Sequence, residues 1–277
     1  RELSKFQLDI LVLDKEEDVG CGATKANSGI VHGGYVAKPG TLKSKLCIQG
    51  NRMYKQLDQE LNFGYKQTGA LVLAFNQEDM EELKKLYQQG IENGVEDIEI
   101  IDKEQALQKE ANLNPNIVAA LYSSEVGITS PYDFAIALME NAIENGVTLK
   151  LNTEVRSIQK DNGTFIVDTG EESYNAKYII NAAGVYSDTI ASMVGQKTFD
   201  ILPRRGQYVI FDRGTGERVN HVIFQVPSKK GKGILVASTY HGNLMIGPNA
   251  EDNYDKEDVG TEREALEEIV NTAKRSF

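Results

Sequence analysis

The chain has 277 residues, of which 40% are hydrophobic and 26% charged, and its formal net charge is −11. This make-up is that of a globular protein with one large domain or two ordinary ones. The acidic balance argues against a nucleic-acid partner, which would need a basic stripe, but leaves a small anionic substrate open if basic residues gather locally.

Cysteine usage and apolar runs indicate the compartment. The two cysteines, Cys21 and Cys47, have no metal-binding spacing and suit a reducing cytoplasm. No apolar run approaches the ~18 residues of a membrane span, and no signal peptide is recognisable. The sequence therefore predicts a cytoplasmic protein, with peripheral membrane association left open.

The first predicted element is a strand over residues 8–13, a nearly continuous apolar run typical of a strand buried on both faces. It ends at Asp14, and dinucleotide-binding folds hold a ribose hydroxyl with a carboxylate at such a position. The alternative is an acid that is simply solvated. The G-x-G-x-x-G turn that accompanies such an acid lies about twenty residues upstream. It would precede Arg1, so we expect a fragment of a longer protein.

Residues 19–34 follow, and they contain five glycines. Because glycine costs backbone entropy, the cluster predicts that something comes close to the backbone. His32 lies among these glycines, and a positioned histidine is the usual general base near neutral pH. The alternatives are a packing role for His32 and a flexible linker for the loop. His221 and His241 have structural explanations, at a strand start and in a tight turn.

Helices and strands then alternate. We predict helices at 41–61, 77–93, 102–110, 131–145 and 187–194, and strands at 70–75, 117–122, 147–151, 153–159, 164–169 and 176–183. Thr41 is the expected N-cap of the first helix. The apolar spacing of this helix predicts a buried face formed by Leu42, Leu46, Met53 and Leu57.

The pattern changes after residue 199. Four segments joined by turns predict an antiparallel sheet, namely 200–211, 219–226, 233–238 and 244–246. A helical pattern follows from residue 256. In the earlier part, by contrast, the helix at 131–145 and the strand at 147–151 predict a parallel sheet with strand 8–13. The strand at 176–183 runs into a small-residue turn at Gly184, where a ligand can approach.

Basic residues gather at Arg204-Arg205-Gly206 and over residues 229–233. An anionic substrate needs such groups, arginine for bidentate contact and lysine as a point charge. Arg205 and Lys232 are the candidates. The alternative is ordinary solvated charge in turns.

Several short motifs together resemble a known family. They are residues 12–15, 26–34, 38–43, 130–132, 181–184, 204–208 and 247–250. In this order they resemble the FAD-dependent oxidoreductases of the D-amino-acid-oxidase type. Within that group the chain is similar to bacterial glycerol-3-phosphate oxidases and dehydrogenases, while the related L-2-hydroxyglutarate oxidases share the loop and the Pro39-Gly40 turn.

The resemblance implies a mixed α/β (α+β) fold in which a Rossmann-like FAD-binding domain is interleaved with an antiparallel-sheet substrate domain. The FAD domain would comprise residues 1–63 and 132–199, the substrate domain residues 64–131 and 200–255, and a C-terminal helix residues 256–277. The family's N-terminal G-x-G-x-x-G and its C-terminal part, which supplies a substrate-binding arginine, are missing from this sequence.

The resemblance also implies roles for individual residues. The cofactor-binding residues would be Asp14 at the adenosine ribose, Thr24, Asn27, Ser28 and Gly33 at the flavin, Val155 by the adenine, and Gly184. His32 would take the proton of the substrate's C2 hydroxyl while hydride passes to the flavin, with Lys232 and Arg205 holding a phosphate. The electron acceptor stays open between oxygen, a quinone and a protein. A 2-hydroxy-acid oxidase and a non-catalytic fragment are the competing hypotheses.

Overall fold

The computed structural model describes residues 1–227 and 233–277, and the chain divides into two compact units. Unit 1 comprises residues 1–27, 131–204 and 252–258; unit 2 comprises residues 28–130, 205–251 and 259–277.

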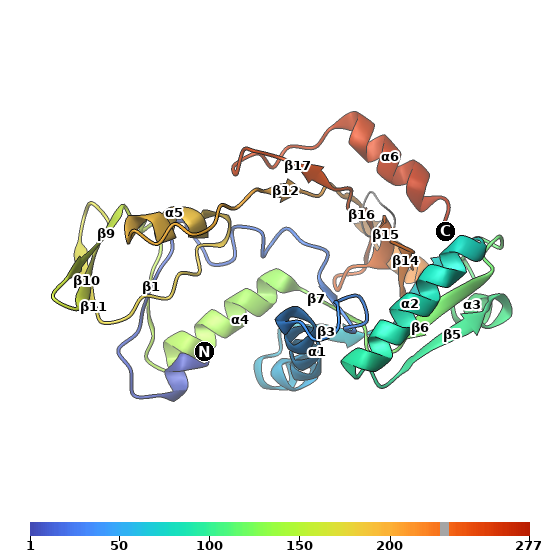
Figure 1. The fold of residues 1–277 in the computed structure, drawn as a ribbon, viewed down its shortest axis with the longest axis horizontal. Coiled ribbons are helices and arrows are strands. Elements are labelled where there is room, and N and C mark those ends of the chain that lie inside the picture. The colour runs from blue at the N-terminus through green and yellow to red at the C-terminus, as the bar shows by residue number, and fades with distance from the viewer. Residues whose placement is uncertain (228–232) are drawn as a thin grey trace. The chain divides into compact units, whose positions relative to one another are not determined.

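Helices and short strands alternate along the chain (Figure 1). The α-helices are α1 (Leu42–Leu61), α2 (Gln77–Asn93), α3 (Lys103–Lys109), α4 (Pro131–Glu144), α5 (Ser187–Met193) and α6 (Arg263–Ala273). The strands before α4 are β1 (Leu11–Leu13), β2 (Ile30–Val31), β3 (Tyr65–Gln67), β4 (Ala70–Ala74), β5 (Ile98–Asp102), β6 (Ala119–Ser123) and β7 (Gly127–Thr129). Those after α4 are β8 (Thr148–Lys150), β9 (Ser157–Asp161), β10 (Thr164–Asp168), β11 (Ser173–Ala176), β12 (Arg204–Arg205), β13 (Val209–Arg213), β14 (Val222–Gln225), β15 (Leu235–Ser238), β16 (Asn243–Gly247) and β17 (Glu251–Asp252).

The boundary between the units differs from the expected domain division at residues 28–63, which cluster with unit 2. Strand β2 pairs with β7, and β3 pairs with the other edge of β7, which gives a small three-stranded sheet. Helix α1 contacts α2 and β3. Both the glycine-rich loop after Ser28 and the helix that follows it are therefore built into unit 2.

A seven-stranded sheet organises unit 2, in the order β13-β16-β15-β14-β4-β6-β5. Its pairs are antiparallel, as expected for the part after residue 199, except that β14 runs parallel to β4 with Val222 opposite Ala70. That parallel pair joins two strands from distant parts of the chain. It places the late strands beside the early ones in one layer.

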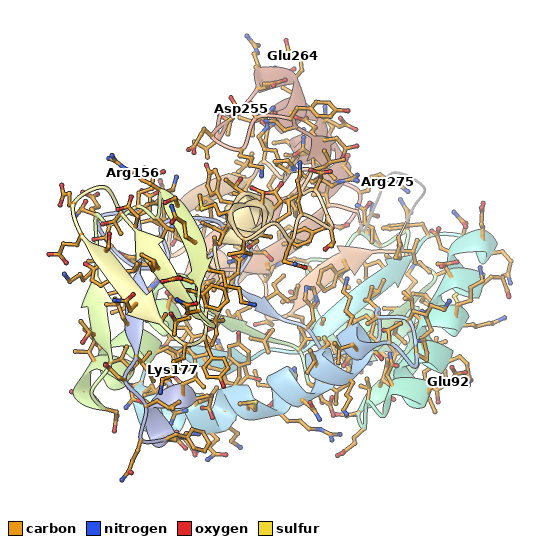
Figure 2. The ribbon with its side chains drawn as sticks, turned by 60° about the vertical axis from the view of Figure 1, so that its left-hand side comes forward. Glu92, Arg156, Lys177, Asp255, Glu264 and Arg275 are labelled. Atoms are coloured by element: carbon orange, nitrogen blue, oxygen red, sulfur yellow. The ribbon has the colours of Figure 1, made fainter. Side chains whose placement is uncertain are left out.

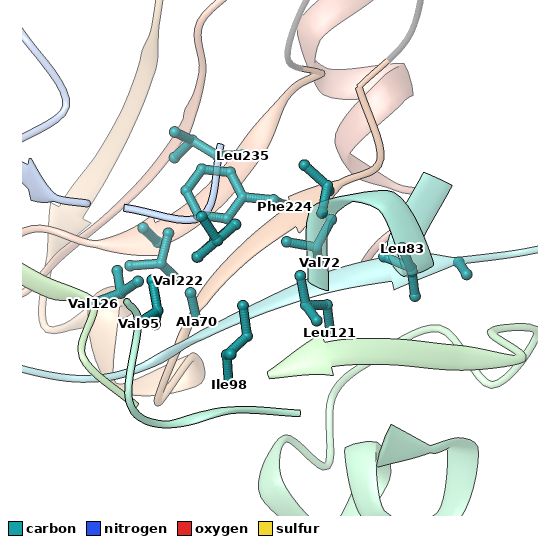
Figure 3. Packing of buried hydrophobic residues seen from close by; sticks show 14 of the residues in the cluster. Ala70, Val72, Leu83, Val95, Ile98, Leu121, Val126, Val222, Phe224 and Leu235 are labelled. Atoms are coloured by element: carbon teal, nitrogen blue, oxygen red, sulfur yellow. The ribbon is translucent and has the colours of Figure 1, made fainter. Parts of the chain in front are cut away.

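Strand β4 is buried on both faces. Ala70 and Val72 pack with Leu83 of α2 in one core cluster, shown in Figure 3, and Leu71 and Leu73 point into a second cluster with residues of α3 and α6. Full burial of such side chains contributes about 1.5–3 kcal/mol each. Helices on both faces of the sheet explain why β4 reads as a continuous apolar run.

Helix α1 begins as predicted, because the Thr41 hydroxyl accepts a hydrogen bond from the Ser44 amide at 3.2 Å. The predicted buried face is wrong: Leu42, Leu46 and Met53 are 70%, 53% and 48% exposed. The buried positions are instead Ser44 and Ile48. The helix turns this less apolar face inward because the glycines before it let Ile48 pack directly on the loop backbone.

Unit 1 holds the predicted parallel pair of β1 and β8, with Leu11 opposite Thr148. Strands β9, β10 and β11, which follow β8 in the sequence, form a separate antiparallel sheet. The hairpin between β9 and β10 turns at Asn162 and Gly163, whose φ angles are +45° and +85°. Two positive φ values in a two-residue turn match the right-handed twist of the flanking strands.

Two expected elements are wrong in extent. The strand expected at 176–183 does not form: β11 ends at Ala176, and Tyr178 and Ile180 are 88% and 71% exposed. No strand among the described residues pairs with this segment, and an unpaired strand leaves its backbone groups without partners.

The helix expected over residues 256–277 begins only at Arg263 and ends at Ala273. Asn253 accepts a hydrogen bond from the Asp255 amide at 3.0 Å, and Asp255 accepts one from the Glu257 amide at 2.9 Å. Such side-chain contacts to the local backbone compete with helix formation.

Asp188 anchors this segment within unit 1. Its carboxylate accepts hydrogen bonds from Lys256 Nζ at 2.6 Å, from the Ile201 amide at 3.0 Å and from the Thr189 amide at 2.9 Å. The Lys256 ammonium, followed by the Ile201 amide, holds the pKa of the Asp188 carboxyl well below its usual value of 3.8. The ionised form of Asp188 is therefore the one that the folded unit binds.

We expect Asp188→Asn to lose less stability than the wild type when the pH is lowered. Because the folded pKa is depressed, the contribution of Asp188 is fully present above the unfolded value and is lost as the pH falls from about 5 toward the folded pKa. Urea unfolding at pH 7 and pH 3 should show a smaller difference in midpoint for the variant than for the wild type. Asp200→Asn, in the exposed pair with Lys197, is the control and should leave the difference unchanged. Equal acid losses in the wild type and Asp188→Asn would contradict the assignment.

Charged side chains cover the surface of each unit. Arg156 and Lys177 of unit 1 are exposed, and Figure 2 shows Glu92 and Glu264 of unit 2 with their side chains directed away from the ribbon. Among the residues that the structure describes, no helix is long and apolar enough to cross a membrane.

Candidate functional site

His32 follows directly on β2 in unit 2 and is half-buried. Its carbonyl accepts a hydrogen bond from Asn51 Nδ2 of α1 at 3.2 Å, and the same Nδ2 donates to the Glu125 carbonyl at 2.8 Å. Its imidazole stacks on the Phe224 ring, with 6.2 Å between the centroids and 26° between the planes. Aromatic pairs at this separation contribute about 0.5–1.5 kcal/mol beyond their buried area. Both the backbone and the ring of His32 are thus contacted by other elements.

The two glycines after His32 are needed for packing within the protein. A Cβ on Gly33 would lie 3.0 Å from Ser123 Oγ and 3.1 Å from Val126 Cγ2. Gly34 has a φ of +92°, and a Cβ there would overlap the Ile48 side chain, whose Cγ1 would be 2.9 Å away. The close approach that the sequence predicted is made here by protein side chains.

The loop before His32 divides between the units. Ser28 belongs to unit 2 and its side chain is hydrogen-bonded to that of Tyr208, whose pKa is raised by burial. Thr24 and Asn27 belong to unit 1 and are exposed. Asn27 Nδ2 donates to the Thr24 carbonyl at 2.7 Å, which folds the loop into a turn and leaves the Thr24 side chain at the surface.

Tyr132 fixes the beginning of this loop. Its hydroxyl donates to Asp18 Oδ2 at 2.6 Å, and this hydrogen bond lowers the pKa of Asp18 and raises that of Tyr132. Gly20, with a φ of +74°, packs its backbone near Tyr132 and Ala135 of α4. The start of α4 therefore sets where the exposed part of the loop begins.

Asp14 is half-buried and directly follows β1. Its backbone amide and carbonyl both form hydrogen bonds with β8 and the residues that follow β8. The Asp14 amide donates to the Lys150 carbonyl at 3.0 Å, and its carbonyl accepts from the Thr153 amide at 2.8 Å. Its Oδ1 accepts from the Glu16 amide at 3.0 Å. A carboxylate at the C-terminal end of a parallel strand is where a ribose binds in dinucleotide folds.

Val155 and Gly184 complete the expected cofactor residues of unit 1. Val155 is half-buried just after β8, and Gly184 is exposed with a φ of +56° and no atom within 4 Å of where a Cβ would lie. The Asp14 carboxylate and the open Gly184 fit the chemistry of an adenosine and its ribose, and the exposed hydroxyl and amide groups of Thr24 and Asn27 suit hydrogen bonds to the flavin half. In unit 1 the residues present therefore fit the expected FAD, whereas the space beside Gly33 in unit 2 is filled by protein.

Of the two candidate substrate-binding residues, Arg205 and Lys232, the structure describes only Arg205. Arg205 is 13% exposed in its side chain and forms ion pairs with Glu251 at 2.9 Å and Glu262 at 2.6 Å. The guanidinium lowers the pKa of Glu251. Gln207, which accepts a hydrogen bond from the Glu262 amide at 2.6 Å, joins the same cluster. Lys232 lies outside the described residues.

The other two histidines have protein partners, in keeping with the structural explanations from the sequence. His221 Nδ1 lies 3.6 Å from a carboxylate oxygen of Glu110, a side chain that is 1% exposed. Glu110 accepts from the Asn220 amide at 2.6 Å and so fastens α3 to the start of β14. His241 Nε2 lies 3.3 Å from Ser130 Oγ.

Sequence reasoning missed Asn51, Phe224 and Tyr208. Asn51 carries a weak signal, since it is a polar residue that follows Ser44 and Ile48 on one face of α1. Tyr208 lies within the recognised motif at residues 204–208, but its contact with Ser28 spans 180 residues. Phe224 reads as an ordinary core residue. Only the pairing of β14 within the sheet brings it to His32.

Comparison with known proteins extends these observations. A family model described as FAD dependent oxidoreductase matches residues 1–277, the whole chain. A glycerol 3-phosphate dehydrogenase from Caloramator mitchellensis is 50% identical over 276 residues, which cover 100% of this chain and 58% of that protein. The chain thus spans little more than half the length of this relative.

Two further similarities are informative. The structure of dithionite-reduced L-alpha-glycerophosphate oxidase from Mycoplasma pneumoniae with FAD bound superposes with a TM-score of 0.93 at 33% identity, covering 99% of this chain and 74% of that one. This likeness bears out the mixed α/β fold class. The mitochondrial L-2-hydroxyglutarate dehydrogenase of Homo sapiens is 31% identical over 258 residues, which cover 88% of this chain and 55% of that protein.

Proposed function

Because the chain belongs to the FAD-dependent oxidoreductase family, we propose that it is the part of a flavoenzyme that oxidises glycerol 3-phosphate to dihydroxyacetone phosphate. The observation that carries this proposal is the 50% identity to a glycerol 3-phosphate dehydrogenase along the whole chain. The likeness to a glycerophosphate oxidase structure at a TM-score of 0.93 also supports it.

Under this proposal FAD is bound by the residues that the sequence motifs single out. Asp14 accepts hydrogen bonds from the ribose hydroxyls, and Val155 and Gly184 lie by the adenosine. Thr24, Asn27 and Ser28 offer hydroxyl and amide groups to the flavin half, whereas Gly33, which packs against Ser123 and Val126, serves the packing of the loop. When bound, FAD supplies the acceptor for the two electrons that the alcohol loses.

His32 acts as the general base. An alcohol that becomes a ketone must lose its hydroxyl proton, and a neutral imidazole accepts it at physiological pH because the reference pKa of histidine is about 6.5. The stacked ring and the anchored carbonyl give His32 the fixed position that proton transfer needs. No other histidine of the described residues offers this setting, since His221 and His241 contact Glu110 and Ser130.

The substrate phosphate is assigned to Lys232 by charge. Arg205 is the second candidate, but Glu251 and Glu262 already face its guanidinium and balance its positive charge. We therefore assign Arg205 to holding the start of α6 against β17.

The competing substrate class is a 2-hydroxy acid, supported by the 31% identity to an L-2-hydroxyglutarate dehydrogenase. The reaction is the same alcohol oxidation with a carboxylate in place of the phosphate. A chain that binds no flavin at all would be a non-catalytic fragment.

Anaerobic mixing distinguishes these functions. A visible spectrum of the purified protein first shows whether flavin is bound. We expect glycerol 3-phosphate to bleach the flavin absorption of the FAD-loaded protein, and L-2-hydroxyglutarate at the same concentration to leave it unchanged. Bleaching by L-2-hydroxyglutarate alone would replace the proposed substrate, and bleaching by neither would remove the proposed function.

A further inference from the structure

His32 stands on a short and permissive stretch of backbone. Strand β2 has only two residues, and Gly33 and Gly34 follow the histidine. Glycines restrict the backbone little. The local sequence therefore fixes neither the orientation of the imidazole plane nor the position of the His32 backbone. Other elements of unit 2 must supply that restraint.

Phe224 restrains the ring. It lies in β14, opposite Val72 of β4, and is 9% exposed within the core cluster. Figure 3 shows its ring beside Leu235 and Val222, which limit the positions it can take. A ring held in this way presents a fixed plane, and the imidazole of His32 lies 26° from parallel to it with the centroids 6.2 Å apart.

Asn51 restrains the backbone. Its Nδ2 is shared by the carbonyls of His32 and Glu125, so one side chain joins the loop after β2 to the turn before β7. Asn51 is carried by α1, a helix of 20 residues. Nearly one turn earlier on the same helix, Ile48 packs against Gly34, so the helix holds the loop at two points.

We propose that Phe224 and Asn51 are positioning residues for His32, Phe224 fixing the plane of its imidazole and Asn51 the place of its main chain. The inference rests on the proposed role of His32 as the base. Proton transfer requires the base within hydrogen-bond reach of the hydroxyl in a set orientation, and a misplacement of about 1 Å can slow a reaction about 10²-fold. Neither residue needs to touch the substrate to have this effect.

The ring contact is tested without turnover. The imidazole C–H resonances of His32 are assigned in the NMR spectrum by their loss in His32→Ala. We expect them to move in Phe224→Leu, because the ring current of the phenyl group is lost, and to return near their wild-type position in Phe224→Tyr. Ile223→Val, on the opposite face of β14, is the matched control and should leave them in place. Unmoved resonances in Phe224→Leu would overturn the role of Phe224.

The backbone contact has its own readout. In Asn51→Ala we expect the amides of residues 33 and 34 to exchange with deuterium about 2- to 10-fold faster, as the loss of one hydrogen bond predicts. Gln49→Ala, on the exposed side of α1, is the control and should not change them. Equal exchange in the two variants would overturn the role of Asn51.

Kinetics then link position to function. In the FAD-loaded protein, Phe224→Leu and Asn51→Ala should lower the rate of flavin reduction by glycerol 3-phosphate about 10- to 10²-fold with a much smaller change in KM. Phe224→Tyr should restore most of the rate, while Ile223→Val and Gln49→Ala keep it. Wild-type rates in both positioning variants would overturn the inference. If His32→Ala itself retains full activity, the proposed function fails, whereas the NMR and exchange results still decide whether the two residues position His32.

Discussion

Replacing His32 by alanine is expected to slow the reduction of flavin by glycerol 3-phosphate by ~10²–10⁴-fold, the usual contribution of a positioned general base. The imidazole is the group that accepts the hydroxyl proton, and alanine leaves only water for that task. Stopped-flow absorbance of the FAD-loaded protein under anaerobic conditions measures this step directly. The flavin spectrum before mixing should stay the same, because His32 is assigned to the substrate side.

The control for His32→Ala is His241→Asn. His241 is also a histidine of unit 2, but it is exposed and its ring contacts Ser130. This variant should reduce flavin at close to the wild-type rate. A decrease of less than tenfold in His32→Ala would remove His32 from the role of base.

The second large effect is expected on stability. Gly34→Ala should lower the free energy of unfolding by about 2–5 kcal/mol, because two costs add. Its φ of +92° is unfavourable for an L-residue by about 1–2 kcal/mol, and the overlap of the new Cβ with Ile48 adds about 1–3 kcal/mol of overpacking. Urea unfolding followed by circular dichroism gives the difference.

Gly40→Ala separates the two costs. Gly40 has a φ of +75° with no atom within 4 Å of an added Cβ, so this variant should show the backbone cost alone. The double variant Gly34→Ala/Ile48→Ala should lose less stability than the sum of its single changes, since the overlap is absent. Equal losses in Gly34→Ala and Gly40→Ala, or full additivity in the double variant, would show that Ile48 does not restrict position 34.

Much of the fold could be predicted from signals within single segments of the sequence. The N-cap Thr41 and the parallel pairing of β1 with β8 are confirmed. Each depends on spacing or capping within one element, or on the rule that a strand, a helix and a strand form a parallel unit. The strand expected over residues 8–13 forms only over Leu11–Leu13, however, and its expected burial on both faces is wrong, because Leu11 is 37% exposed.

The errors come from contacts between distant segments. The apolar spacing of α1 predicted that Leu42 and Leu46 face inward, but the orientation of this helix is set by Gly34 and Ile48. Likewise, residues 177–183 are apolar enough for a strand, yet a strand needs a neighbour to accept its hydrogen bonds. The apolar periodicity of one segment shows neither which residues will pack against a helix nor whether a strand will have a neighbour.

The candidate site divides in the same way. His32 was identified from its sequence neighbours, and its role stays a prediction. Phe224 and Asn51, which contact its ring and its carbonyl, come from a strand about 190 residues later and from the next helix. The packing of Gly33 against Ser123 shows a further limit, because a glycine required by a protein side chain and one required by a ligand look the same in a sequence.

The discontinuous make-up of the two units has a consequence for how the chain is synthesised and dissected. Each unit is assembled from three separate stretches, and the last stretch of each comes after residue 251. During translation, neither unit can be completed until residues after 251 have left the ribosome, and β4 waits about 150 residues for its partner β14. Non-local pairing of this kind folds slowly and exposes apolar strands meanwhile. Neither unit can be excised as one contiguous segment, so studies of an isolated unit require rejoining its pieces by new linkers.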